Sequence, residues 1–299
     1  MDTFKIMYKR NVKLFFKDKG LFFTSLITPL ILLVLYVSFL ANVYRDSFLA
    51  IIEGGFKLSV EESVINAVVS GQLLSSLLAV SCVTVSFCSN MLMVQDKATG
   101  VRKDLLISPV KKSTLALSYY LATLTSTLIV CYVALGACFI YVAFVGWYFT
   151  FTDVLLLILD VFLLSTFGTA LSSVVNFFLS SQGQISAVGS VVSSVYGFVC
   201  GAYMPLSNLS EGLRNVIMFL PGTYGTSLIR NHALNSAFAK IPQEQQGMLA
   251  TALRDFVDCN IYFFDTKVLE STMYIVLVST ILVCIGAYVL MNKVSKKKV

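Results

Sequence analysis

A carboxylate at Asp160 lies inside a long apolar run, where it is the side chain best placed to do chemistry. Carboxylates within a membrane are costly and often carry protons or cations, so ion coupling is one interpretation. Asp153 lies about two helical turns earlier on the same face, near the expected outer end of that run. The resulting depth of about 10 Å favours the alternative, a structural hydrogen bond from Asp160 to a Ser or Thr of a neighbouring helix.

The remaining residues offer little for catalysis or metal binding. His232 is the only histidine, so we expect neither a zinc cluster nor a His-based dyad, and we predict that His232 is an ordinary polar residue at the outer surface. The chain lacks the G-x-x-x-x-G-K-[ST] pattern of a P-loop, which would cradle ATP. Its seven cysteines form no CxxC pair and fit buried apolar positions. We therefore expect no catalytic residue, no metal and no cofactor on this chain.

The elements that must position Asp160 are membrane spans. The sequence is 57% hydrophobic and 13% charged, whereas soluble domains carry roughly a quarter of charged residues. A helix needs about 20 apolar residues to cross the bilayer, and a lone span satisfies its backbone only as a helix. We predict an all-α integral membrane protein that forms one transmembrane domain over residues 1–299. Its six predicted transmembrane helices are residues 21–44, 65–94, 114–145, 152–178, 184–204 and 271–292.

The basic residues predict the orientation of these spans. Of 22 Lys and Arg residues, six lie in residues 1–20, five in 95–113 and four after residue 292. The positive-inside rule makes these three segments cytoplasmic, and an even number of spans also puts both termini inside. Because the net charge of +6 is divided among the ends of apolar runs, it does not indicate nucleic-acid binding.

Two segments outside the spans have helical patterns of their own. In residues 1–20 an aromatic face alternates with lysines, which predicts an amphipathic helix at the inner interface; a plain extension of span one is the alternative. Residues 205–270 form the largest external segment. Its first part is too apolar for an ordinary loop, so we predict re-entrant helices there, before the last span. Residues 236–262 are predicted to form a small external helical piece.

Span five is rich in small residues. Gly189, Ser193 and Gly197 form one small-xxx-small row, and Ser186, Ser190 and Ser194 form another. Such rows let helices approach closely. We predict a tight helix–helix interface here, which two copies of the protein could share, with polar lining of a transport path as the alternative.

Two longer patterns favour a specific function. The first is the loop 95–113, where Gly100 precedes Leu105-Leu106 and the sequence Ser108-Pro109-Val110 leads into span three. The loop predicts a short, rigid cytoplasmic helix ended by the proline. The second pattern follows span five and consists of Gly201, Pro205, Leu220, Pro221, Tyr224 and Arg230.

Together these patterns resemble the permease subunits of ABC exporters, in the family that includes drug, polyketide, bacteriocin and polysaccharide exporters. That family has six spans, both termini inside, a "GT…LL.SPV" loop between spans two and three, and a "G…P…LR…LP.TY…LR" segment after span five. The resemblance covers nearly the whole chain. The sequence departs from it at Val101 and Gln95, where the family usually has Thr and Glu.

The resemblance implies that residues 96–110 dock in a cleft of a separate P-loop ATPase, which would hold the ATP and Mg. The residues that it assigns to this coupling are Gly100, Leu105, Leu106, Ser108, Pro109 and Val110. It also implies a second permease, identical or related, and ATP-driven export of an amphipathic compound, a peptide or a lipid-linked substrate. The chain itself would be no enzyme, and its location would be a plasma membrane, of a bacterium.

Two other classes of function stay open. An ion-coupled secondary transporter or channel would use Asp160 as its ion site, act without an ATPase and often show internal repeats. We find no convincing repeat between residues 1–145 and 152–299. A membrane sensor or anchoring subunit is the third class, and the large re-entrant segment argues against it.

Overall fold

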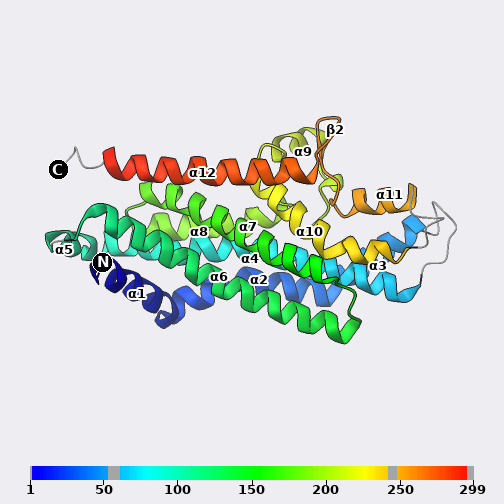
Figure 1. Cartoon of the computed structure of the whole chain (residues 1–299), viewed down its shortest axis with the longest axis horizontal. Coiled ribbons are helices and arrows are strands. Elements are labelled where there is room, and N and C mark those ends of the chain that lie inside the picture. Colours follow the sequence, from blue (N-terminus) through cyan, green and yellow to red (C-terminus); the bar gives the residue numbers. More distant parts are fainter. Residues whose placement is uncertain (1, 53–60, 109, 242–247, 295–299) are drawn as a thin grey trace.

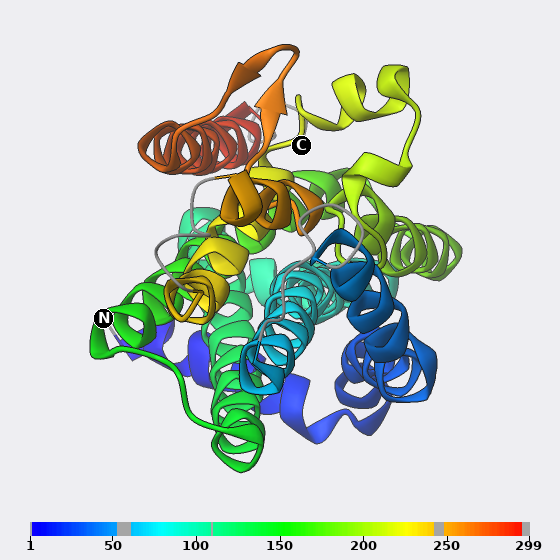
Figure 2. The ribbon, with the colours of Figure 1, turned by 90° about the vertical axis from the view of Figure 1, so that its right-hand side faces the viewer.

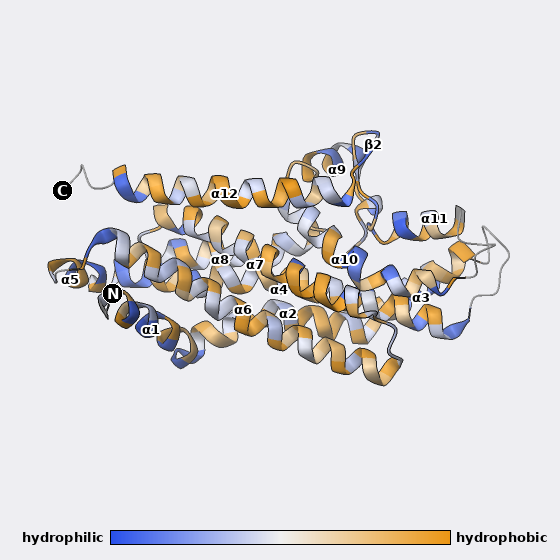
Figure 3. Ribbon diagram, viewed as in Figure 1, coloured by the Kyte–Doolittle hydropathy of each residue, from blue (hydrophilic) through white to orange (hydrophobic). Residues whose placement is uncertain are grey.

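The computed structural model describes residues 2–52, 61–108, 110–241 and 248–294, and the chain forms a bundle of long, roughly parallel helices (Figure 1). Apart from one two-stranded hairpin, the elements in these ranges are helices. Apolar residues cover the middle of the bundle and charged residues gather towards its ends (Figure 3). The predicted all-α membrane fold is confirmed.

Five helices in the described ranges are long and apolar enough to cross a membrane. The first runs from Lys19 to Ala50 as α2 (Lys19–Leu35), a turn of π-helix (Tyr36–Leu40) and α3 (Ala41–Ala50). The others are α4 (Glu62–Ala98), α6 (Lys112–Val145), α7 (Phe151–Phe178) and α12 (Glu270–Val294). These helices extend beyond most of the predicted ranges, because polar residues at the interfaces continue each helix past its apolar run.

The predicted fifth span corresponds to α8 (Gln182–Val199), which is not among those five. Its 18 residues are about 27 Å long by helix rise, close to the thickness of the hydrocarbon. The helix ends before the predicted residue 204 because Gly201 has a φ of +73°, a conformation that breaks a right-handed helix. A count of six spans therefore depends on whether α8 crosses the membrane, and it stays a prediction.

At its N-terminus the chain forms a separate helix, α1 (Asp2–Lys17). Asp18 ends it and caps α2, since its carboxylate accepts a hydrogen bond from the Leu21 N–H at 3.1 Å. Phe15 is buried against the bundle, and the lysines of α1 lie on the exposed side of this helix. We call the end of the bundle that holds α1, the loop between α4 and α6, and the C-terminal turn of α12 the basic end (Figure 1).

Helix α4 lies at the centre of the bundle, as the end-on view shows (Figure 2). It packs against α2, α6, α7, α8 and α10 (Pro221–Ala239), and its apolar stretch is buried all round. Its contact with α7 is especially close at Gly168, where a Cβ would lie 2.9 Å from the carbonyl oxygen of Cys82. Further along, the Asn90 amide donates hydrogen bonds to the hydroxyls of Ser172 and Ser173, at 3.0 Å each.

The opposite end of the bundle holds the segment between α8 and α12. A 3-10 turn (Leu206–Asn208) leads to the short α9 (Glu211–Ile217), and α10 follows with Pro221 at its first position. Proline is favoured there because the missing N–H has no helical partner anyway. Next come α11 (Met248–Phe256) and a hairpin of β1 (Tyr262–Phe263) and β2 (Thr266–Lys267). The helical piece predicted at 236–262 is thus divided between the end of α10 and α11, and the hairpin was not predicted.

Candidate functional site

The loop between α4 and α6 forms a short helix, α5 (Val101–Ile107), at the basic end. Gly100 precedes it with a φ of +85°, and a Cβ at this residue would meet no atom within 4 Å. The glycine is therefore required for its left-handed backbone rather than for space. Pro109, which was predicted to end the helix, lies outside the described residues.

Helix α5 has one face on the bundle and one face in the open. Leu105 and Leu106 are half-buried and pack, with Val110, against a cluster from α4, α6 and α12. Ile107 is 85% exposed. Three consecutive apolar residues cannot share one face, because successive helical residues point about 100° apart. The open face carries Lys103, Asp104, Ile107 and Ser108. The partner contact of Leu105 and Leu106 stays a prediction, and Ile107 is the apolar side chain of α5 that lies in the open.

The base of α5 is fixed to α7 through Lys97, in the last turn of α4. Its ammonium group donates hydrogen bonds to the carbonyl oxygens of Asn176 at 3.2 Å, Phe177 at 2.6 Å and Leu179 at 3.1 Å. These carbonyls lie at the end of α7, where helical hydrogen bonding runs out; the Asn176 carbonyl accepts one further bond from the Leu179 N–H at 3.3 Å. A cation there also interacts favourably with the helix dipole. A displacement of α5 and the end of α4 must therefore act on the end of α7.

The same turn of α4 is connected to α1. Arg10 and Asp96 form a two-pronged ion pair, with N–O distances of 2.7 Å and 3.1 Å. The hydroxyl of Tyr119, in α6, also donates to Asp96. Because Asp96 is buried and Arg10 is half-buried, this pair joins α1, α4 and α6 at a site partly shielded from water.

At the opposite end, Arg230 of α10 is buried, with 1% of its surface exposed. Its guanidinium lies 3.2 Å from Asp258 Oδ2 and donates to the carbonyl of Gly201 at 2.8 Å. Asp258 also accepts a hydrogen bond from the Leu206 N–H at 2.9 Å. Burial raises the pKa of the Asp258 carboxyl to about 6, although Arg230 and the Leu206 N–H oppose that rise.

Gly201 belongs to the second sequence pattern, and the structure shows why glycine is needed at this position. Its left-handed φ favours glycine, and a Cβ would lie 3.1 Å from both Asp258 Oδ2 and the Leu206 side chain. Pro205 precedes the 3-10 turn. Leu220 and Pro221 form the corner into α10, and the Tyr224 hydroxyl donates to the Met218 carbonyl at 2.6 Å to close it. The pattern thus places Gly201, Arg230 and this corner in one packed assembly.

Asp160 lies at a junction of three helices. Its Oδ2 lies 2.5 Å from Nδ1 of His232 in α10, and its Oδ1 accepts a hydrogen bond from the Tyr274 hydroxyl of α12 at 2.7 Å. All three side chains are buried or half-buried. The prediction that His232 lies at the outer surface is wrong, because α10 is a long buried helix that turns this histidine towards α7. Asp160 therefore pairs with His232 and Tyr274, and not with the Ser or Thr that the sequence predicted.

The space beside the small residues of α8 is partly filled by other side chains of the same chain. A Cβ on Gly197 would lie 2.3 Å from the Tyr203 ring, and one on Gly189 would lie 2.5 Å from the end of Met91 in α4. The Ser193 carbonyl accepts a hydrogen bond from the Tyr203 hydroxyl at 3.4 Å. The other row stays open, since Ser186, Ser190 and Ser194 are exposed.

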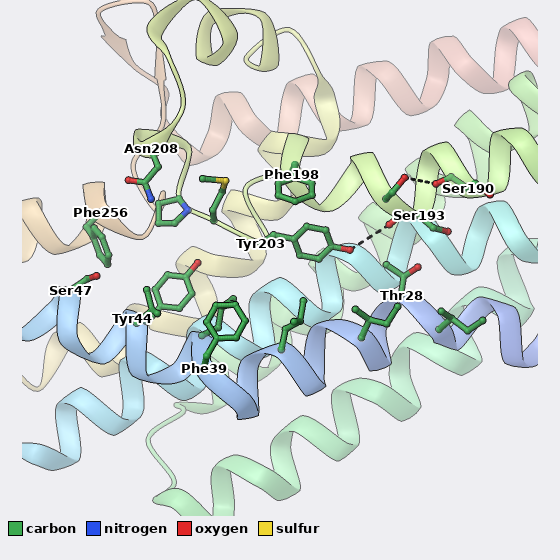
Figure 4. A pocket seen from close by; sticks show the side chains of 18 residues that line it. Thr28, Phe39, Tyr44, Ser47, Ser190, Ser193, Phe198, Tyr203, Asn208 and Phe256 are labelled. Carbon is green, nitrogen blue, oxygen red and sulfur yellow. Dashed lines mark hydrogen bonds between the residues drawn. The ribbon is translucent and has the colours of Figure 1, made fainter.

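A groove of ≈ 700 Å³ separates α8 from the first long helix, α2–α3 (Figure 4). Most of its walls are apolar or aromatic, including Phe39 and Phe198. Thr28, Ser190 and Asn208 add polar groups at separate points along its length. A volume of this size, with mostly apolar walls and few polar groups, is typical of sites for drug-sized molecules.

Three residues of this arrangement were not identified from the sequence. Ile107 could have been found by noting that a seven-residue helix cannot bury three successive apolar residues. Lys97 could have been found as a lysine directly after an apolar run, within reach of a helix end. No sequence signal pairs His232 with Asp160, because 71 residues separate them and only the packing of α10 on α7 brings them together.

Comparison with known proteins gives one match. The sequence model of the family described as ABC-2 type transporter matches residues 2–233. This range includes α5, the groove residues from α2, α3 and α8, and the part of α10 that carries Arg230 and His232. A search of curated proteins finds no match.

Proposed function

This chain belongs to the ABC-2 type transporter family, and on that premise we propose that it is the permease subunit of an ATP-driven exporter. The observation that carries the proposal is the open face of α5, where Ile107 is 85% exposed on a helix fixed to α4 and α7. Single exposed apolar side chains are common on protein surfaces, so the support for docking comes from the position of Ile107 on a short helix at the basic end, outside the five long apolar helices. ATP and Mg would be bound by a separate P-loop ATPase, and this chain would not be an enzyme.

In the proposed mechanism, the ATPase holds α5 and moves it when ATP closes the ATPase dimer. Because Lys97 ties the base of α5 to the end of α7, and Asp96 ties it to α1 and α6, the motion reaches several helices at once. The distribution of Lys and Arg supports a cytoplasmic location for the basic end. A multi-pass location in a bacterial plasma membrane is part of the same proposal.

The groove between α8 and α2–α3 supports an amphipathic cargo. Its apolar and aromatic walls suit hydrocarbon, whereas Thr28, Ser190 and Asn208 can orient polar groups. The exposed serine row of α8 adjoins the groove and supports a second permease packed near it, since small residues allow close helix contact. The transport path would then lie between the two permeases.

The decisive test is purification of the chain from its native membrane in a mild detergent, followed by mass spectrometry of the proteins that accompany it. We expect a P-loop ATPase in equal molar amount. An intact, correctly folded chain that is isolated alone, and that carries solute in liposomes without ATP, would contradict the proposal.

The same complex tests the cargo class. In liposomes, an amphipathic dye such as rhodamine 6G is expected to stimulate ATP hydrolysis, whereas sucrose is not. A complex that responds to sucrose and to no amphipathic compound would argue against the groove as the cargo site.

Substitutions of Asp160 distinguish the proposed exporter from an ion-coupled transporter. Asp160→Asn retains an oxygen for the Tyr274 hydroxyl and adds an N–H that can face His232, so we expect fold and ATP-driven transport to survive. Asp160→Leu leaves both partners unpaired, and its free energy of unfolding should fall by about 1–3 kcal/mol. Thermal unfolding in detergent and transport in liposomes measure the two effects. A well-folded Asp160→Asn variant without transport would favour an ion site.

A further inference from the structure

A second groove lies between α6 and α12, near the basic end, with a volume of ≈ 340 Å³. These two helices touch little along their length, and the rings of Tyr120 and Tyr288 form the floor between them. The walls are apolar, from Leu117, Leu121 and Val289. The groove runs from Ile285 to Lys293, about 12 Å by helix rise, which matches the upper part of a lipid acyl chain.

One end of this groove is polar and positively charged. Ser113, Asn292 and Lys293 line its mouth. A small adjoining cavity shares Ala116, Tyr288 and Asn292 with it and is lined as well by Arg102 and Lys112. Among the residues that the structure describes, no carboxylate forms an ion pair with Arg102, Lys112 or Lys293. Lys293 thus lines the groove itself, and Arg102 and Lys112 line the cavity beside it, so three cations without an ion pair lie around this end of the groove.

The floor of the groove carries an unsatisfied polar group. Tyr120 is 9% exposed, and its hydroxyl has no hydrogen-bond partner in the described part of the chain. The Tyr288 hydroxyl, by contrast, donates to the Ala116 carbonyl at 3.3 Å. A buried hydroxyl without a partner is unfavourable, so the packing of Tyr120 beside the groove is not fully satisfied within the described part of the chain.

From these observations we propose that the α6–α12 groove binds one anionic phospholipid from the leaflet next to the basic end. The acyl chain lies between Leu117 and Val289, and the phosphate lies at the groove end lined by Ser113, Asn292 and Lys293, next to the small cavity of Arg102 and Lys112. An apolar slot that ends in unpaired cations at the depth of the headgroups matches a lipid with a negative headgroup. A neutral lipid fits the slot but leaves the cations unpaired.

The position of Arg102 gives the bound lipid a regulatory role. Arg102 belongs to α5, and Leu106 of the same helix lines the adjoining cavity. A phosphate held there fixes α5 against α6 and α12, in the orientation that presents Ile107. This role rests on the proposed function of α5, whereas the binding of the lipid does not.

Native mass spectrometry of the purified full-length chain in detergent tests the binding, with phosphatidylglycerol and phosphatidylcholine of equal chain length as probes. We expect tighter binding of phosphatidylglycerol. The double variant Lys112→Gln with Lys293→Gln should weaken its binding roughly 30-fold, given the usual contribution of a basic residue near a lipid surface. Lys111→Gln is the charge control, because Lys111 is exposed and lines neither cavity.

The groove itself is tested with Val289→Trp, which fills the slot from an exposed position, and with Val283→Trp as the control on the same helix, 70% exposed and outside the groove. Only the first should weaken phosphatidylglycerol binding. Equal binding of the two lipids, unchanged binding by the double variant or by Val289→Trp, or complete displacement by glycerol phosphate would overturn the proposal. The lipid test needs no ATPase, so its failure leaves the proposed function untouched.

Discussion

Ile107→Asp is expected to abolish the association of this chain with the proposed ATPase partner while the helical bundle stays folded. Ile107 is 85% exposed, so its replacement removes no packing within the chain. At a docking contact, however, the change removes a buried apolar side chain and places an unpaired charge in a desolvated cleft. Losses of that kind reach about 4 kcal/mol or more at the centre of an interface, which is roughly a thousandfold in affinity.

The measurement is the amount of ATPase that purifies with the variant, together with its thermal unfolding. Ile107→Leu keeps the apolar side chain and should retain the ATPase. Leu105→Asp is a less direct test, because Leu105 packs on the cluster with Val110 and its replacement also weakens the bundle. If Ile107→Asp keeps a full complement of ATPase, α5 does not dock through this face.

Arg230→Met is expected to cause the largest loss of stability, about 3–5 kcal/mol in the free energy of unfolding. Arg230 and Asp258 are both buried, and removal of the guanidinium leaves the Asp258 carboxylate and the Gly201 carbonyl without their partner. The measurement is unfolding in detergent. Arg45→Met is the matched control, because the Arg45–Glu62 pair is exposed and should contribute at most about 1 kcal/mol.

The loss in Arg230→Met should depend on pH. The pKa of Asp258 is already raised to about 6 by burial, and removal of the nearby positive charge raises it further. A raised pKa means that the folded state binds a proton that the unfolded state releases, so the variant should become more stable as the pH falls from 8 to 5. Asp258→Asn in the same background should remove this pH dependence. A pH-independent loss would mean that the carboxylate is not what destabilises the variant.

The sequence predicts this fold well wherever length and hydropathy decide the structure. An apolar run of about 20 residues must be helical in a membrane, so the cores of α4, α6, α7 and α12 follow from composition alone. The family resemblance, carried by the loop after α4 and the segment after α8, is confirmed by the match over residues 2–233.

What the sequence does not predict depends on packing between distant residues. The sequence predicts that His232 is an isolated polar residue, and only the packing of the helices brings it next to Asp160. The sequence predicts that a second helix packs against Gly197, yet the Tyr203 ring of the same chain fills the space beside this residue. The open side of α5 is decided in the same way, because the cluster with Leu115 and Tyr119 takes Leu105 and Leu106 and leaves Ile107 outside.

The close contact of α4 with α7 has a consequence for alternating access. Gly168 brings the two backbones together, Asn90 bridges them, and Lys97 caps the end of α7. Sliding α4 along α7, or separating the two helices, would break all three contacts at once. The pair should therefore move as a single rigid body about 55 Å long. In the proposed transport cycle the hinge surfaces then lie around this pair, at its contacts with α2, α6, α8, α10 and α12. The π-helical turn at Tyr36–Leu40 touches the pair there, because the Tyr36 hydroxyl donates to the Val69 carbonyl of α4.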